Sequence, residues 1–153
     1  MAIADDAVEI RSQGWRTLAA LHGVLEGELE RALQREHQLS VVEYTVLEAL
    51  SRQDGWHMRM AQLARAAALS SSATTRLVNR LEERNMLRRY LCVDDRRGIY
   101  TELTDGGRAL LEQARPTHDS TLEFALDEAC RTPELAPLVA ALHSLPSVNP
   151  VSA

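Results

Sequence analysis

Cysteine is scarce in this chain of 153 residues, in which only Cys92 and Cys130 occur. Two cysteines exclude a framework of several disulfides and a four-cysteine zinc site. Aromatic residues make up only 4% of the sequence, which argues against a β-sandwich and favours helices rich in alanine and leucine. The histidines other than His22 show no metal-ligand spacing among themselves, so we expect neither a metal nor another cofactor.

Long hydrophobic runs are also missing, since none approaches the roughly 18–20 residues that cross a bilayer. The first ten residues contain three acids ahead of any arginine and no apolar segment, so we expect no secretory signal peptide. These absences predict a cytoplasmic protein with no membrane partner.

Motifs of catalysis are absent as well. The sequence has no glycine-rich phosphate loop, no Gly-x-Ser-x-Gly elbow and no paired Ser/His/Asp spacing. We therefore expect that the protein is not an enzyme.

Lysine does not occur, and all 17 basic residues are arginines. The net charge is −5, but the charge is unevenly distributed. The stretch from Trp56 to Tyr100 holds nine arginines and four acids, whereas the rest of the chain holds eight arginines and eighteen acids. A basic centre in an acidic frame is typical of a nucleic-acid-binding module within a scaffold that repels DNA.

The apolar spacing predicts helices through most of the chain. Leucines at 18, 21, 25 and 29 predict one long helix over about 8–36. Ser40 and Glu43 form a capping-box pattern at the start of a second helix that ends near Arg52. Two further helices, over about 60–67 and 70–84, are joined by a tight turn and predict a helix-turn-helix.

The segment after this pair predicts a wing. Residues 87–93 and 98–103 are rich in strand-forming side chains and flank a charged tip, which indicates a β-hairpin. Thr104 then caps another long helix, in which Pro116 predicts a kink. Thr132-Pro133-Glu134 predicts the start of a last helix, followed from Ser144 by a frayed tail.

Residues 69–112, LSSSATTRLVNRLEERNMLRRYLCVDDRRGIYTELTDGGRALLE, resemble the recognition helix, wing and following helix of the MarR family of bacterial transcription regulators. The wing motif is Asp95-Arg96-Arg97, counted back from Leu103-Thr104, although Asp94-Asp95-Arg96 is a second possible frame. Asn85 stands where the family usually has glycine, and it tolerates the same left-handed conformation.

The resemblance covers roughly residues 10–145 and implies a mainly α fold with a small β-wing. It implies a winged helix-turn-helix lobe over 39–104 and a helical dimerisation region over 1–38 and 105–153. The implied function is that of a homodimeric, sequence-specific DNA-binding regulator. Its site would be an inverted repeat with half-sites about one helical turn apart.

Helical spacing turns one polar face of the 70–84 helix outward, where an arginine reads guanine and an asparagine reads adenine. The start of this helix offers free amides to a phosphate. In the wing, one arginine is expected to enter the minor groove while an aspartate orients it. The expected DNA-binding residues are Ser71, Ser72, Thr75, Arg76, Asn79, Arg80, Arg88, Arg89, Asp95, Arg96 and Arg97.

Family members commonly respond to small aromatic or phenolic acids, so the resemblance implies a repressor that such an effector releases. On the first helix, Arg16 is a candidate to pair with a carboxylate while Trp15 or His22 packs on the ring. The alternative is an intersubunit ion pair at Arg16 and a Trp15 that is plain interface core.

Two other functions stay open. Cys92 lies beside Arg88 and Arg89, which favour a thiolate, so a redox-responsive regulator is one alternative; an inert, buried Cys92 and Cys130 are the other interpretation. A helical interaction module without DNA binding is the second. The arginines of the recognition helix and the wing argue against it.

Overall fold

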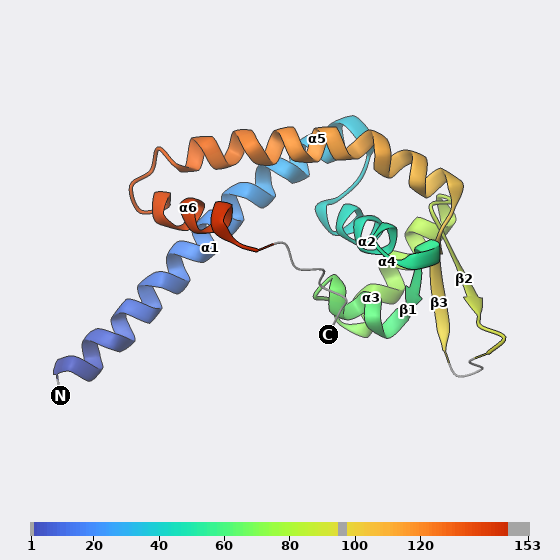
Figure 1. Cartoon of the computed structure of the whole chain (residues 1–153), viewed down its shortest axis with the longest axis horizontal. Helices are drawn as coiled ribbons and strands as arrows, with labels where there is room; N and C mark the ends of the chain where they lie inside the picture. Colours follow the sequence, from blue (N-terminus) through green and yellow to red (C-terminus); the bar gives the residue numbers. More distant parts are fainter. Residues whose placement is uncertain (1, 95–97, 147–153) are drawn as a thin grey trace.

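The computed structural model describes residues 2–94 and 98–146. Its elements follow the order expected of a winged helix-turn-helix with flanking long helices (Figure 1). In chain order they are α1 (Ala2–His37), α2 (Val41–Ser51), the 3₁₀ turn η1 (Asp54–Trp56), β1 (His57–Arg59), α3 (Met60–Ala66), α4 (Ser71–Glu83), β2 (Leu87–Leu91), β3 (Ile99–Leu103), α5 (Asp105–Ala129) and α6 (Ala136–Ser144).

The two long helices, α1 and α5, pack side by side, and we call this pair the bar. The remaining helices α2, α3 and α4 and the sheet form a smaller lobe below one end of it (Figure 1). The C-terminal half of α1 packs antiparallel on α5: Leu21 shares a buried cluster with Ala129, and His37 Nε2 lies 2.8 Å from Thr117 Oγ1. Figure 1 shows α2, α3, α4 and the sheet below one end of α5, and the N-terminal half of α1 projecting away from the rest of the chain. The predicted mainly α fold with a small β-wing is confirmed.

The predicted caps explain where the helices of the lobe begin. Ser40 Oγ accepts from Glu43 N at 3.0 Å while Glu43 Oε2 accepts from Ser40 N at 2.9 Å, so the capping box is complete. Thr104 Oγ1 accepts from Gly107 N at 3.0 Å and caps α5 in the same way. Asn85 ends the recognition helix with a φ of 59°, the left-handed conformation expected there.

The sheet has three antiparallel strands in the order β1-β3-β2, one more than the predicted hairpin. The missed strand, β1, pairs His57 with Glu102 and Arg59 with Tyr100. It is only three residues long, which is too short for alternation of polar and apolar residues to mark it in a sequence.

The main core lies between the lobe and the bar. It joins Leu50, Leu63 and Leu81 of the lobe to Leu33 of α1 and Leu111 of α5, all fully or almost fully buried. Apolar side chains of the lobe therefore pack against both long helices. The division into a lobe over 39–104 and a dimerisation region remains a prediction.

The last helix begins later than predicted. Thr132-Pro133-Glu134 form a turn, in which Thr132 O accepts from Leu135 N at 3.0 Å, and α6 starts at Ala136 with Pro137 in its first turn. Pro116 lies within α5, which continues through it. Among the helices in residues 2–94 and 98–146, none combines the length and the apolar character that a bilayer crossing needs.

Candidate nucleic-acid interface

The recognition helix α4 has two sharply different faces. Thr74, Leu77, Val78 and Leu81 are buried against the lobe. Ser70 caps the helix, since its Oγ accepts from Ala73 N at 3.2 Å. The opposite face is exposed and polar, and it comprises Ser71, Ser72, Thr75, Arg76 and Arg80.

The turn between α3 and α4 aims the start of α4 outward. Ala68 adopts a φ of 54°, and Leu69 N donates to Ala64 O at 2.9 Å. This left-handed residue reverses the chain within four residues, which is the geometry of a helix-turn-helix. The first turn of α4 is thereby exposed, with amides available to an anion.

Arg76 lies at the centre of the exposed face. Its side chain is exposed, and within the part of the chain that the structure describes its guanidinium has no hydrogen-bond or ion-pair partner. An uncompensated arginine on a projecting helix suits bidentate contact with a guanine edge or a phosphate.

Arg80 and Asn79 are placed differently from Arg76. Arg80 Nε lies 3.8 Å from Glu43 Oε1, so this arginine leans toward the body of the lobe. Asn79 is only half exposed, and its Oδ1 is buried without a hydrogen-bond partner among residues 2–94 and 98–146. Asn79 is thus less exposed than Arg76 and lies on the side of α4 next to Arg89 of β2, and its role in DNA binding stays a prediction.

Glu43 fixes the recognition helix to the neighbouring helix. This buried carboxylate caps α2 and also lies 3.7 Å from Arg84 Nη1, which donates to Gln38 O at 2.9 Å. Glu43 and Arg84 together thus link the residue that follows α1, the start of α2 and the end of α4. Their contacts hold the exposed face of α4 at a set angle to the scaffold.

Both arginines of β2 are paired with carboxylates. Arg88 Nε donates to Glu102 Oε2 at 2.6 Å, and this contact raises the pKa of Arg88. Arg89 Nε donates to Glu82 of α4 at 2.7 Å. The structure therefore places both in ion pairs, which a phosphate would have to displace. The expected tip residues Asp95, Arg96 and Arg97 lie outside the described residues.

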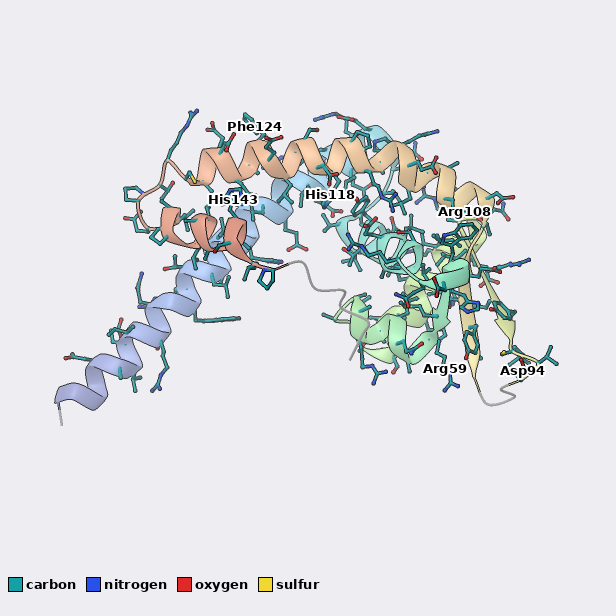
Figure 2. All side chains as sticks on the ribbon, viewed as in Figure 1. Arg59, Asp94, Arg108, His118, Phe124 and His143 are labelled. Atoms are coloured by element: carbon teal, nitrogen blue, oxygen red, sulfur yellow. The ribbon has the colours of Figure 1, made fainter. Side chains whose placement is uncertain are left out.

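The outer face of the sheet carries an arginine that the sequence did not single out. Arg59 Nε donates to the Tyr100 hydroxyl at 3.0 Å, and its guanidinium lies 5.7 Å from the centre of that ring. The Tyr90 hydroxyl and His57 Nδ1 form a 2.5 Å hydrogen bond beside it, and burial raises the pKa of Tyr90. In Figure 2, Arg59 and Asp94 lie at the same lower edge of the lobe.

Arg59 belongs to the basic stretch noted in the sequence. Its position beside Tyr100 depends on strand β1, which the sequence did not predict. Pairing of β1 with β3 brings residues 59 and 100 together across 41 positions of sequence. Arg65 on α3 is a second exposed arginine of the lobe without an assigned role. A strong strand signal around 57–59 would have been needed to find this face.

Of the three expected effector residues, Trp15 and Arg16 lie on the N-terminal half of α1, and His22 lies just beyond its middle. Trp15 is 69% exposed, and Arg16 Nη2 donates to Glu9 and to Gln13, each at 2.8 Å. His22 lies at an apolar groove of about 220 Å³ between α1 and α6, whereas Trp15 and Arg16 do not line it. The N-terminal half of α1, which carries Trp15 and Arg16, projects away from the lobe (Figure 1).

The junction of lobe and bar is filled by a different set of side chains. The rings of Tyr44 and His118 stack with their centres 4.3 Å apart, and burial raises the pKa of Tyr44 to about 12. Arg115 of α5 bonds Glu48 at 3.0 Å and Ser51 at 2.8 Å, both on α2. These contacts join α5 to α2, the helix that carries Glu43.

Both cysteines are more accessible to solvent than expected. Cys92 is half-buried and Cys130 is exposed, so the expectation that both are buried is wrong. Arg88 and Arg89, the neighbours expected to favour a Cys92 thiolate, are each bonded to a carboxylate. In residues 2–94 and 98–146, no three His, Cys, Asp or Glu side chains gather in a way that would hold a metal ion.

Known proteins share both this sequence pattern and this geometry. The MarR family model matches residues 37–98, from the end of α1 to the wing. The HTH-type transcriptional regulator PecS of Dickeya dadantii (strain 3937) is 31% identical over 94 residues, which cover 59% of this chain and 57% of PecS. The match thus spans little more than half the length of PecS.

Two solved structures cover more of the chain. AbsC, a MarR family transcriptional regulator from Streptomyces coelicolor, is 32% identical, with a TM-score of 0.72 over 84% of this chain and 86% of AbsC. Sco3205, a MarR family transcriptional regulator from the same organism, was solved in complex with DNA. It is 29% identical, with a TM-score of 0.72 over 84% of this chain and 81% of its own.

Proposed function

The chain belongs to the MarR family of transcriptional regulators, and from that membership we propose that it is a homodimeric repressor which a small aromatic or phenolic acid releases from its operator. As a member of this family it is a DNA-binding regulator and not an enzyme. The repressor role, the dimer, the effector and the contact residues are our proposals.

The exposed face of α4 is the observation that carries the proposal. Ser71, Ser72 and Thr75 surround the first turns, and Arg76 projects beside them without a carboxylate partner among the described residues. Hydroxyls and free amides suit phosphates, and the arginine suits a base edge in the major groove. In the proposed complex, Arg80, Asn79 and the wing contact the flanking backbone.

A second copy of the chain accounts for the apolar residues that this protomer leaves exposed. Trp15, Leu18 and Val24 on α1 and Leu142 and Leu145 at α6 are all more than two-fifths exposed. A symmetric pairing through α1, α5 and α6 would bury them and present two α4 helices to successive major grooves. The operator would then be an inverted repeat.

Binding to the DNA upstream of its own coding sequence tests the proposal. Fluorescence anisotropy over a salt series should show an affinity that falls linearly on logarithmic axes, because arginines displace cations from phosphates. Sedimentation of the free protein should give a dimer. Failure to bind any duplex at low salt would favour the interaction module without DNA binding.

The effector is proposed to bind near Trp15, Arg16 and His22 in the assembled dimer. Arg16 is exposed and exchanges its contacts with Glu9 and Gln13 at little cost, because an exposed ion pair contributes about 1 kcal/mol or less. A bidentate pair with an aromatic carboxylate is stronger. His22 borders the apolar groove, which offers a ring a surface to pack on.

Replacing Arg16 with alanine tests this site. We expect the variant to keep its DNA affinity within about twofold and to lose release by an aromatic acid such as salicylate, which a thermal-shift screen would check first. Glu9→Ala removes the partner of Arg16 but not the cation, and it should retain the response. Joint loss of DNA binding and response in Arg16→Ala would instead indicate an intersubunit ion pair.

A further inference from the structure

The far half of the wing exposes large apolar side chains. Leu91 at the end of β2 is 67% exposed, Ile99 at the start of β3 is 50% exposed, and Val93 is 90% exposed. We call these three residues the apolar wing patch. Exposed apolar groups gathered on a projecting hairpin indicate a surface that a partner covers.

The strand register shows which way the patch faces. Leu91 pairs directly with Ile99, as Leu87 pairs with Leu103 at the buried end of the hairpin. Because side chains two apart share a face, Leu91 continues the face of Leu87 and Arg89. The Leu91–Ile99 pair thus lies on the same face as the buried Leu87–Leu103 pair, with the Arg89–Thr101 pair between them.

This face is the one turned toward the recognition helix. Arg89, two residues before Leu91, bonds Glu82 of α4 at 2.7 Å. Tyr90 and Tyr100 lie on the opposite face with Arg59 and His57. A duplex that contacts the exposed face of α4 in its major groove would therefore meet the patch in the adjacent minor groove.

We propose that the apolar wing patch packs on the deoxyribose walls of that minor groove. The proposal rests on the DNA-binding function proposed above and adds a contact made without charge. Sugar carbon–hydrogen groups line both walls of the groove, and proteins that enter it often do so with apolar side chains. We favour DNA over a protein partner because the patch lies on the face of the hairpin that is turned toward α4, the helix proposed to contact the duplex.

The contact has a distinctive signature, because burial of apolar surface displaces no cations. Affinity from phosphate contacts falls with salt, whereas affinity from apolar contact does not. Removing the patch should weaken binding equally at all salt concentrations and leave the slope unchanged. Removing a phosphate-contacting arginine should reduce the slope.

The test is the double variant Leu91→Thr/Ile99→Thr, since threonine is polar and has the β-branched shape that strands favour. We expect DNA affinity about tenfold lower and an unchanged salt slope, with Val93→Thr giving a smaller loss in the same sense. Thermal melting shows whether the hairpin is intact. The comparison variant is Phe124→Thr on α5, which is 61% exposed. Because α5 belongs to the proposed dimer contact, any loss of affinity in this variant should come with dissociation of the dimer, which the wing variant should not show.

If the wild type binds DNA and the folded double variant binds it equally well, the proposal that the patch contacts DNA is overturned. The proposed function would still stand. A change only in self-association of the DNA-free protein would assign the patch to contacts between wings, and would also overturn the proposal. Absence of DNA binding by the wild type would remove both proposals together.

Discussion

Reversing the charge at Arg76 is expected to abolish specific binding to the operator. The Arg76→Glu variant would lose the proposed bidentate base contact, which contributes about 1–3 kcal/mol, and would place a carboxylate among phosphates. Since the proposed dimer would present this residue to its operator twice, we expect affinity to fall at least about 100-fold. The residue is exposed and α4 keeps its buried face, so the fold should be unaffected.

Anisotropy titration of labelled operator measures the loss, and Arg131→Glu provides the matched control. Arg131 follows α5, its side chain is 76% exposed, and its reversal changes the net charge by the same amount. It should alter affinity by less than about twofold if local contact and not net charge decides binding. Equal losses in both variants would remove Arg76 from the interface.

Adding one methyl group at Gly107 is expected to destabilise the whole lobe. A Cβ at this position would stand 2.1 Å from Met86 O and 3.0 Å from Met86 C, which are backbone atoms. Met86 O is held in place because it accepts from Thr104 N at 3.1 Å. Gly107→Ala must therefore separate α5 from the link between α4 and β2, and we expect a loss of about 3 kcal/mol in the free energy of unfolding.

Urea denaturation measures this loss, and the neighbouring Gly106→Ala is the control. At Gly106 the closest atom to an added Cβ is Asn85 O at 3.3 Å, a contact that a small adjustment relieves. Its free energy of unfolding should change by less than about 1 kcal/mol, since alanine also favours the helix. Similar stability of the two variants would mean that the Met86 backbone moves aside freely.

Much of the fold follows from short-range rules that a sequence displays. Ser40 with Glu43, Ser70 and Thr104 mark helix starts because a side-chain oxygen must bond the first free amides, and Asn85 marks an end because it tolerates positive φ. The exposed face of α4 follows from its helical period. These features depend on residues within four positions of one another.

What sequence reasoning missed depends on partners distant in the chain. β1 exists because β3 offers it an edge, and Arg59 gains its place from Tyr100. The pairing of Arg88 with Glu102 and of Arg89 with Glu82 likewise requires the hairpin register and the packing of β2 beside α4. Thr132-Pro133 satisfies the local pattern of a helix start, yet the chain turns there first.

The projecting half of α1 has a consequence for the lifetime of the regulator. From Asp6 to Ala20 no side chain is buried, and Leu21 is the first that is. A helix of this length without tertiary contact is marginal in water. In a newly made, lone protomer this segment would therefore fray and expose its backbone to proteases. The pairing with a second copy proposed above would cover this segment, so unassembled chains would be degraded before assembled ones.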